Sequence, residues 1–305
     1  MTASQRWSRR TWIKAVAWST AAVATGAAAL AIADADRSDT GAPLFSRQLG
    51  TNGPLLVFLP GIGATTRYWE LVVGALSGRM RLLLVDLLGF GRSPKPWTTY
   101  SVERHVKELR RVLADQRAFT LVGHSLGARL AVAYAARYPE QVERLVLVSM
   151  PYFGGEGEAT KFIRERDNSG WLWSHVIPFA LYCLLGRKLL GWAAPLLARD
   201  VPRAVAEDLN QMTWRSSTST MWEAIYRHDL TDDIARVPAR IPFVCLHGDR
   251  DASAPLDRMR ALQGLHPNCV IRVYPGADHQ LPLRHAEWVR EQLVTAAAAP
   301  EPAPA

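Results

Sequence analysis

The stretch Thr120-Leu121-Val122-Gly123-His124-Ser125-Leu126-Gly127 places the pattern Gly-x-Ser-x-Gly between an apolar run and a helix that is apolar along one side. A serine that must project above a sheet needs a sharp, strained turn from strand to helix. Glycines two residues before and after it remove side chains that would clash with the neighbouring strand and helix. The pattern therefore predicts that Ser125 is a nucleophile. The alternative is a small-residue turn in which Ser125 only caps the helix.

Around this stretch, short apolar runs alternate with segments whose apolar residues recur at helical spacing. The runs are nearly continuous in Val and Leu, which suits strands that a parallel sheet buries on both faces. The alternation predicts an α/β fold with a mostly parallel central sheet flanked by helices. The expected strands are Leu55–Leu59, Leu82–Val85, Thr120–Val122, Leu145–Val148, Phe243–Leu246 and Val270–Tyr274. The expected helices are Trp69–Leu76, Val102–Leu113, Leu126–Arg137 and Arg284–Val294.

The alternation breaks between Tyr152 and Ile234, where Trp and Tyr are frequent and no clear strand is visible. We interpret residues 152–234 as a helical lid inserted between two strands. Residues 36–151 and 235–295 then form the core of one large α/β domain, a size that such domains commonly reach. Residues 296–305 are rich in Ala and Pro and are expected to form a disordered tail.

The composition excludes several classes of protein. The chain has 305 residues, 49% of them hydrophobic and 21% charged, which is too apolar for a disordered chain. Three cysteines cannot form a disulfide framework, so stability must come from a packed core. The formal net charge is +8, but half of this excess comes from four basic residues within the first 33 positions. A nucleic-acid partner is therefore not expected.

The N-terminal segment, residues 1–35, has the parts of a secretory signal. Ser8-Arg9-Arg10-Thr11-Trp12-Ile13-Lys14 precedes the uncharged stretch Ala15–Ala33, which ends in small residues. The paired arginines resemble a twin-arginine export signal, and this predicts a periplasmic or extracellular protein. An uncleaved membrane anchor is the main alternative, because 19 uncharged residues are just long enough to span a bilayer. A second alternative is that the start codon is wrongly assigned and the segment is not part of the protein.

Beyond the Gly-x-Ser-x-Gly stretch, the chain from Leu44 to Val294 resembles the α/β-hydrolase family. The family order of serine, acid and histidine implies an acid after a later strand. Gly248-Asp249-Arg250-Asp251-Ala252-Ser253-Ala254-Pro255 is similar to the family turn Gly-x-x-Asp-x-x-x-Pro, so the resemblance assigns the acid to Asp251. Asp249 is interpreted as a turn-stabilising carboxylate. The earlier position used by some members reads Ser149-Met150-Pro151 and offers no carboxylate.

The resemblance assigns the histidine to His279, which follows the last expected strand. The other histidines are interpreted as structural or exposed, and His124 is expected to point away from Ser125. In the family geometry His279 accepts the serine proton, while Asp251 fixes its tautomer and stabilises the imidazolium.

The family also implies an oxyanion hole formed by two main-chain amides, those of Leu126 and Ile62. Ile62 lies in Leu59-Pro60-Gly61-Ile62-Gly63-Ala64, where Pro60 replaces the usual histidine. The segment Asp86–Ser93 resembles a family element with a structural role. The sequence has no metal-ligand cluster or dinucleotide loop, so no metal and no cofactor are expected.

These residues predict a serine hydrolase that cleaves carboxylic esters, thioesters or lactones of apolar acyl or aromatic substrates through an acyl-serine. Ser125 argues against epoxide hydrolases and haloalkane dehalogenases, which need a carboxylate there. One alternative is a carbon–carbon bond hydrolase of ring-cleavage products, although such relatives often have Asn where this chain has His124. The other is a non-catalytic ligand-binding protein. The lid stretch Trp171–Leu185 is expected to line a large apolar pocket, to pack on the body, or to contact a membrane.

Overall fold

The computed structural model describes residues 25, 32, 41–154, 156–186 and 202–298. These residues contain one sheet with the strand order β1-β3-β2-β4-β5-β6-β7, parallel except for β1, which pairs antiparallel with β3. The strands are β1 (Ser46–Leu49), β2 (Leu55–Leu59), β3 (Arg81–Val85), β4 (Phe119–His124), β5 (Val142–Val148), β6 (Phe243–Gly248) and β7 (Cys269–Tyr274). The predicted α/β class with a mostly parallel sheet is confirmed.

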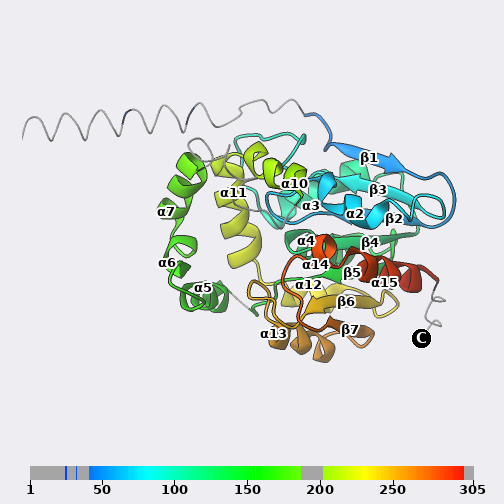
Figure 1. Cartoon of the computed structure of the whole chain (residues 1–305). Coiled ribbons are helices and arrows are strands. Elements are labelled where there is room, and N and C mark those ends of the chain that lie inside the picture. The colour runs from blue at the N-terminus through cyan, green and yellow to red at the C-terminus, as the bar shows by residue number, and fades with distance from the viewer. Residues whose placement is uncertain (1–24, 26–31, 33–40, 155, 187–201, 299–305) are drawn as a thin grey trace, which may run out of the picture.

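Helices cover both faces of this sheet (Figure 1). On one face lie η1 (Thr66–Trp69), α2 (Glu70–Val73), α14 (Leu281–Arg284) and α15 (Ala286–Ala298). On the other lie α3 (Val102–Val112), α4 (Leu126–Arg137), α12 (Thr231–Arg236), α13 (Leu256–Arg260) and η6 (Ala261–Gly264).

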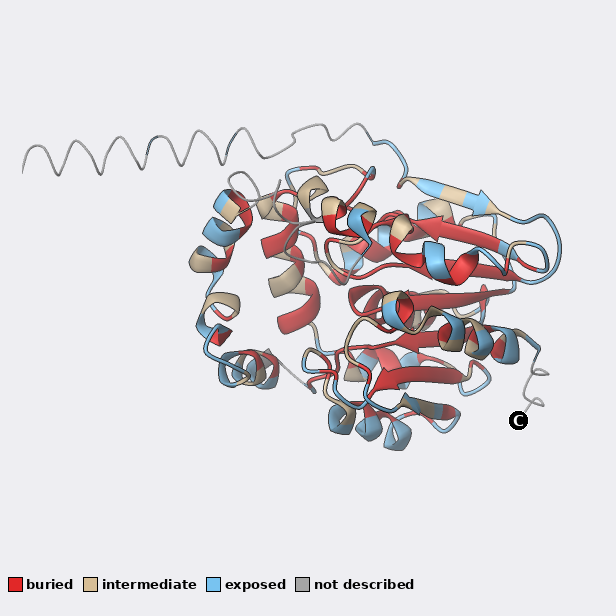
Figure 2. Ribbon diagram, in the orientation of Figure 1, coloured by how far each residue is buried: buried red, intermediate tan, exposed pale blue. Residues whose placement is uncertain are grey.

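Alternate residues of the central strands point to opposite faces of the sheet and pack into two separate hydrophobic cores. In β2, Leu56 and Phe58 join the cluster with α2 and α15, whereas Val57 and Leu59 join the cluster with α3 and α4. All five residues of β2 are buried, as the red central strands of Figure 2 show. Continuous burial explains why the inner strands read as unbroken apolar runs. β1 was not predicted, because it is an edge strand whose residues alternate between exposed and half-buried.

The described part of the segment between β5 and β6 consists of helices and connecting loops without a strand, and we refer to residues 152–234 as the insertion. Its helices gather at one end of the sheet (Figure 1). They are α5 (Glu156–Glu165), α6 (Gly170–Trp173), α7 (Val176–Leu181), η2 (Tyr182–Gly186), α10 (Arg203–Asp208), η4 (Leu209–Gln211), α11 (Trp214–Thr220) and η5 (Met221–Tyr226).

A buried arginine of α4 ties this insertion to the core. The guanidinium of Arg129 donates hydrogen bonds to the carbonyl oxygens of Pro151 (2.8 Å), Ala224 (3.0 Å) and His228 (2.6 Å). Pro151 directly precedes the insertion, and the other two acceptors lie near its end. Burial lowers the pKa of Arg129 to about 10, against the opposing effect of Asp229 and Asp233. One side chain thus clamps both ends of the insertion.

The ends of the chain are described only in part. The expected signal or anchor, residues 1–35, lies outside the described residues except for Thr25 and Ile32. None of the helices in the described part of the chain combines the length and hydropathy needed to cross a bilayer. At the other end, α15 continues to Ala298, three residues into the predicted tail, because alanines favour helix and Ala296 is buried. Residues 299–305 of that tail lie outside the description.

Candidate active site

The turn between β4 and α4 holds Ser125 in a strained conformation. Its φ of 52° and ψ of −115° lie outside the regions that non-glycine residues favour. The turn is compact because of its glycines: a Cβ added to Gly123 would lie 2.4 Å from the backbone of Gly127. One added to Gly127 would lie 2.3 Å from the carbonyl oxygen of Leu59. The sequence pattern therefore corresponds to a real packing requirement.

The structure brings Ser125, His279 and Asp251 together, although they come from three loops at the same edge of the sheet. The Nε2 atom of His279 lies 3.0 Å from Ser125 Oγ. Its Nδ1 atom lies 2.8 Å from Asp251 Oδ2 and 3.0 Å from Asp251 Oδ1. Both distances fit hydrogen bonds, so serine, imidazole and carboxylate form one continuous chain.

The carboxylate of Asp251 is buried and held by its own turn. Its Oδ1 accepts hydrogen bonds from the amides of Ser253 (2.9 Å) and Ala254 (2.8 Å). Burial acts to raise the pKa of Asp251, but the hydrogen bond and charge of His279, together with the Ala254 amide, lower it below its ordinary value. Asp249, by contrast, accepts a hydrogen bond from the amide of Gly276 (2.6 Å) across the neighbouring turn. Of the two acids, only Asp251 contacts His279.

Two main-chain amides beside Ser125 are free. Within the described part of the chain, no backbone hydrogen bond uses the amides of Ile62 or Leu126. Leu126 begins α4, so its amide is one of the helix N-terminal donors that have no acceptor within the helix. Ile62 lies in a turn closed by the hydrogen bond from Ala64 N to Gly61 O (3.2 Å), with Gly63 at a φ of 75°.

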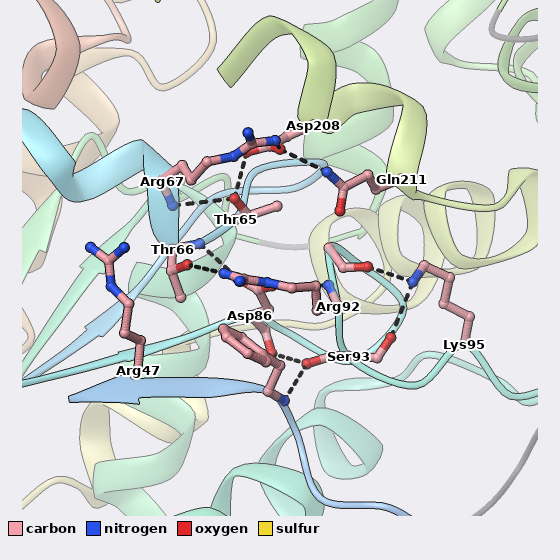
Figure 3. A network of polar contacts seen from close by, with 12 residues as sticks. Arg47, Thr65, Thr66, Arg67, Asp86, Arg92, Ser93, Lys95, Asp208 and Gln211 are labelled. Carbon is pink, nitrogen blue, oxygen red and sulfur yellow. Dashed lines mark hydrogen bonds and ion pairs between the residues drawn. The ribbon is translucent and has the colours of Figure 1, made fainter. Parts of the chain in front are cut away.

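The loop that carries Ile62 is fixed to the body through Asp86. The Asp86 carboxylate accepts hydrogen bonds from the amides of Thr66 (2.6 Å) and Arg92 (2.9 Å). Ser93 in turn donates to the carbonyl of Asp86 and accepts from the amide of Phe45 (2.9 Å). Figure 3 shows these contacts side by side. The segment Asp86–Ser93 thus has the structural role that the resemblance implied.

A cavity of about 210 Å³ opens at Ser125. Its walls are largely apolar, and none of the described residues that line it is Lys or Arg. The lining residues are Gly61, Ile62, Gly63, Ala64, Tyr68, His124, Ser125, Val205, Ala206, His279, Gln280 and Leu283.

The insertion contributes to this cavity through α10 rather than through the stretch expected from the sequence. Val205 and Ala206 line the cavity, and no residue of Trp171–Leu185 does. Within that stretch, Phe179 and Cys183 face inward and are buried, whereas Trp171 and Ile177 are 58% and 70% exposed. The expectation that Trp171–Leu185 lines the pocket is wrong, because its inward-facing residues pack within the insertion, Phe179 against Trp222.

His124 has a place in the site that the sequence did not indicate. Instead of pointing away, it lines the same cavity as Ser125, and its Nε2 lies 2.9 Å from the carbonyl oxygen of His279. Burial, and then the neighbouring His279, lower the pKa of His124 to about 3. The ring is therefore neutral, and an N–H at Nε2 donates to that carbonyl. This hydrogen bond fixes the main chain of the His279 loop.

Tyr68 and Gln280 complete this support and were also missed. The hydroxyl of Tyr68 donates to Oε1 of Gln280 (2.8 Å), the residue after His279, and lies 3.1 Å from His124 Nε2. The Tyr68 ring stacks on the His124 ring with centroids 4.6 Å apart. Their roles depend on the packing of η1 against the His279 loop, for which no local sequence signal exists.

Comparisons with known proteins identify the family. A family model for the alpha/beta hydrolase fold matches residues 54–173. A 2-(acetamidomethylene)succinate hydrolase of Mesorhizobium japonicum is 31% identical over 239 residues, which cover 75% of this chain and 82% of that protein. The chain therefore belongs to the α/β-hydrolase family.

Two further similarities agree with this assignment. An Arabidopsis thaliana protein named "Probable lysophospholipase BODYGUARD 3" is 30% identical over 297 residues, covering 84% of this chain and 59% of that protein. The crystal structure of a bromoperoxidase from Bacillus anthracis matches with a TM-score of 0.68 at 23% identity, covering 83% of this chain and 94% of the other. This last likeness concerns the fold alone.

Proposed function

We propose that this protein is a serine hydrolase that cleaves carboxylic esters with uncharged, apolar acyl groups. The observation that carries the proposal is the hydrogen-bonded chain from Ser125 through His279 to Asp251. A serine hydroxyl is a weak nucleophile and needs an adjacent base, which the imidazole supplies. The family relationship supports hydrolysis as the reaction class.

In the proposed reaction, Ser125 Oγ attacks the ester carbonyl carbon while His279 Nε2 takes the hydroxyl proton. Asp251 stabilises the resulting imidazolium through Nδ1–H. Collapse of the tetrahedral intermediate breaks the bond to the leaving alkoxide, which receives the proton from His279. Water then attacks the acyl-serine with His279 again acting as the base. This second step returns a free Ser125 and releases the acid.

The free amides of Ile62 and Leu126 are the proposed oxyanion hole. Developing negative charge on the carbonyl oxygen needs donors that are already oriented, and such donors are often the largest single contribution to catalysis. Neither amide has a backbone acceptor within the described residues, so both are available. Pro60 does not interfere, because the proposed donors are main-chain groups.

The cavity favours a modest, uncharged acyl group. Its volume of about 210 Å³ exceeds the roughly 150 Å³ of an apolar cavity that binds benzene, but it is smaller than drug-sized pockets of about 300 Å³ or more. Butanoyl, hexanoyl and benzoyl esters are therefore the first substrates to test. Thioesters and lactones of similar acids fit the same chemistry.

Hydrolysis of a small carboxylate-bearing substrate is a second candidate, since the 31% identical relative is named for a succinate derivative. A dicarboxylate normally requires a cationic partner, and the described lining has no Lys or Arg. Carbon–carbon bond cleavage remains the third. A panel of neutral esters, N-acyl enamine dicarboxylates and vinylogous diketones separates the three.

Labelling by a fluorophosphonate probe tests the proposal. An activated serine displaces fluoride from phosphorus, and peptide mass spectrometry should locate the adduct on Ser125. The Ser125→Ala variant, folded to the same thermal midpoint, should show no adduct. Absence of labelling in the native protein, together with no turnover across the panel, would instead favour a non-catalytic ligand-binding protein.

We also propose that the N-terminal segment directs export of the protein to the periplasm or the extracellular space. The support is the arrangement of Arg9 and Arg10 before the uncharged stretch Ala15–Ala33.

A further inference from the structure

A buried carboxylate joins the insertion to the loop that carries Ile62. Asp208 ends α10, and its side chain is fully buried. It accepts hydrogen bonds from Thr65 Oγ1 (2.5 Å) and Arg67 Nε (3.2 Å), and it also pairs with Arg67 Nη2. Gln211, from the insertion itself, donates to Asp208 Oδ1 (2.9 Å). Figure 3 shows Asp208 between the arginine, the threonine and the glutamine.

The core partners of Asp208, Thr65 and Arg67, flank a residue that is itself hydrogen-bonded to the body. Thr66, which lies between Thr65 and Arg67, is held by the buried carboxylate of Asp86. The start of η1 is therefore fixed to the body at Thr66 and to the insertion at Thr65 and Arg67. The hydrogen bond to Asp208 raises the pKa of Arg67, so the guanidinium stays charged.

The described side chains of the short helix α10 make few other polar contacts. Its buried residues are Val205, Ala206 and Asp208, and Val205 joins the core cluster that contains Tyr68. Arg203 and Glu207 pair with each other within the helix (2.8 Å). Among the described residues of α10, only Asp208 has a side-chain hydrogen bond to the core. Val205 and Ala206, which line the cavity, belong to the same short helix as Asp208.

We propose that Asp208 is a positioning residue that holds α10 over the cavity at Ser125, and that Val205 on this helix limits the length of the acyl group. The inference rests on the proposed ester hydrolysis and names its specificity determinant. Loss of the ion pair lets α10 move outward, because it removes the hydrogen bonds that join this helix to Thr65 and Arg67. Short acyl groups lose contacts, and longer ones gain room.

Chain-length profiles test this inference. We compare kcat/KM for p-nitrophenyl butanoate and octanoate in the native protein and in Asp208→Asn, normalised to the serine titrated by fluorophosphonate. The kcat/KM for butanoate divided by that for octanoate should be about tenfold lower in Asp208→Asn than in the native protein. A change of this size is expected for the loss of one charged hydrogen bond. The KM for butanoate should rise more than kcat falls. In the matched control Glu207→Gln, the ratio should stay within about twofold, because an exposed pair inside one helix contributes little.

Two further variants keep the inference falsifiable if Asp208→Asn does not fold. Arg67→Gln removes the same ion pair from its partly exposed side and should lower the ratio similarly. Combining Asp208→Asn with Arg67→Gln should lower this kcat/KM ratio little further, since both changes remove the same ion pair. Val205→Ala should raise kcat/KM for octanoate relative to butanoate while the ion pair remains.

The possible failures can be told apart. An unchanged ratio in both ion-pair variants would overturn the role of Asp208, and an unchanged ratio in Val205→Ala would overturn that of Val205. A native protein that neither binds the probe nor hydrolyses either ester would instead contradict the proposed function.

Discussion

The tight packing of the turn at Gly123 and Gly127 holds Ser125 at a φ of 52°. In this conformation Ser125 Oγ lies within hydrogen-bond distance of His279. The position of Ser125 could be predicted from the two glycines, and those of Asp251 and His279 from the resemblance to the turns and residue order of the family. His124, Tyr68, Gln280 and Asp208 could not. Their contributions arise where distant loops meet, and a single polar residue in a loop has no distinguishing pattern.

The two acids of the β6 turn should have very different effects on turnover. Asp251→Asn should lower kcat by up to about four orders of magnitude, as for the buried acid of serine proteases, because the histidine loses its orienting partner. Asp249→Asn should lower kcat little, since Asp249 accepts a hydrogen bond from the amide of Gly276 and does not contact His279 within the described residues. Steady-state kinetics on a butanoyl ester measures both. Equal losses, or a larger loss in Asp249→Asn, would refute the assignment of Asp251.

Buried neutral histidines should make the fold sensitive to acid. Burial, and then Arg104, lower the pKa of His105 to about 3, while the unfolded chain titrates near 6.5. A lowered native pKa gives stability that is present above about pH 6.5 and lost as the pH falls toward 3. Between pH 7 and pH 5 this loss is about 2 kcal/mol.

His105→Gln tests this account, because glutamine can still donate to Thr220 but cannot take up a proton in this range. Urea unfolding at pH 7 and pH 5 gives the free energy of unfolding at each pH. The loss between them should be smaller in the variant by about 2 kcal/mol. The same loss in both proteins would show that His105 does not contribute.

At the level of elements, the inner strands and the main helices could be predicted because continuous burial leaves apolar runs of recognisable length. The edge strand β1 could not, since half-exposed residues at a sheet edge resemble a loop. The role of α10 was also hidden. A six-residue helix with two buried apolar side chains has no periodic signal. The more apolar stretch Trp171–Leu185 favours a pocket lining in the sequence but does not line the cavity.

The clamp of the insertion by Arg129 predicts a large effect on stability. Arg129→Met removes the donor for three carbonyl oxygens, those of Pro151 and Ala224 buried and that of His228 half-buried, and should lower the free energy of unfolding by about 2–4 kcal/mol. Arg203→Met, in the exposed ion pair of α10, should change it by less than about 0.5 kcal/mol. Urea unfolding at neutral pH measures both. Similar values for the two variants would show that Arg129 is not a clamp.

At the scale of the whole molecule, export makes a prediction about the chain itself. The mature protein should begin near Asp34 or Asp36 and lie outside the cytoplasmic membrane. Replacement of Arg9 and Arg10 by Lys should retain the full-length precursor inside the cell. N-terminal sequencing of fractionated cells measures this outcome. An intact Met1 in the soluble cytoplasmic fraction would contradict export, and an intact Met1 in the membrane fraction would favour the anchor.

Catalysis by Ser125 is the central claim, and turnover of a butanoyl ester by Ser125→Ala tests it most directly. Removal of Oγ should lower the rate of hydrolysis to that of the uncatalysed reaction plus the small rate that the oxyanion hole alone can sustain. The thermal midpoint should hardly change, because only one atom with a single hydrogen bond is lost. Retention of more than a few per cent of native kcat/KM by the purified variant, free of contaminating esterase, would contradict the account.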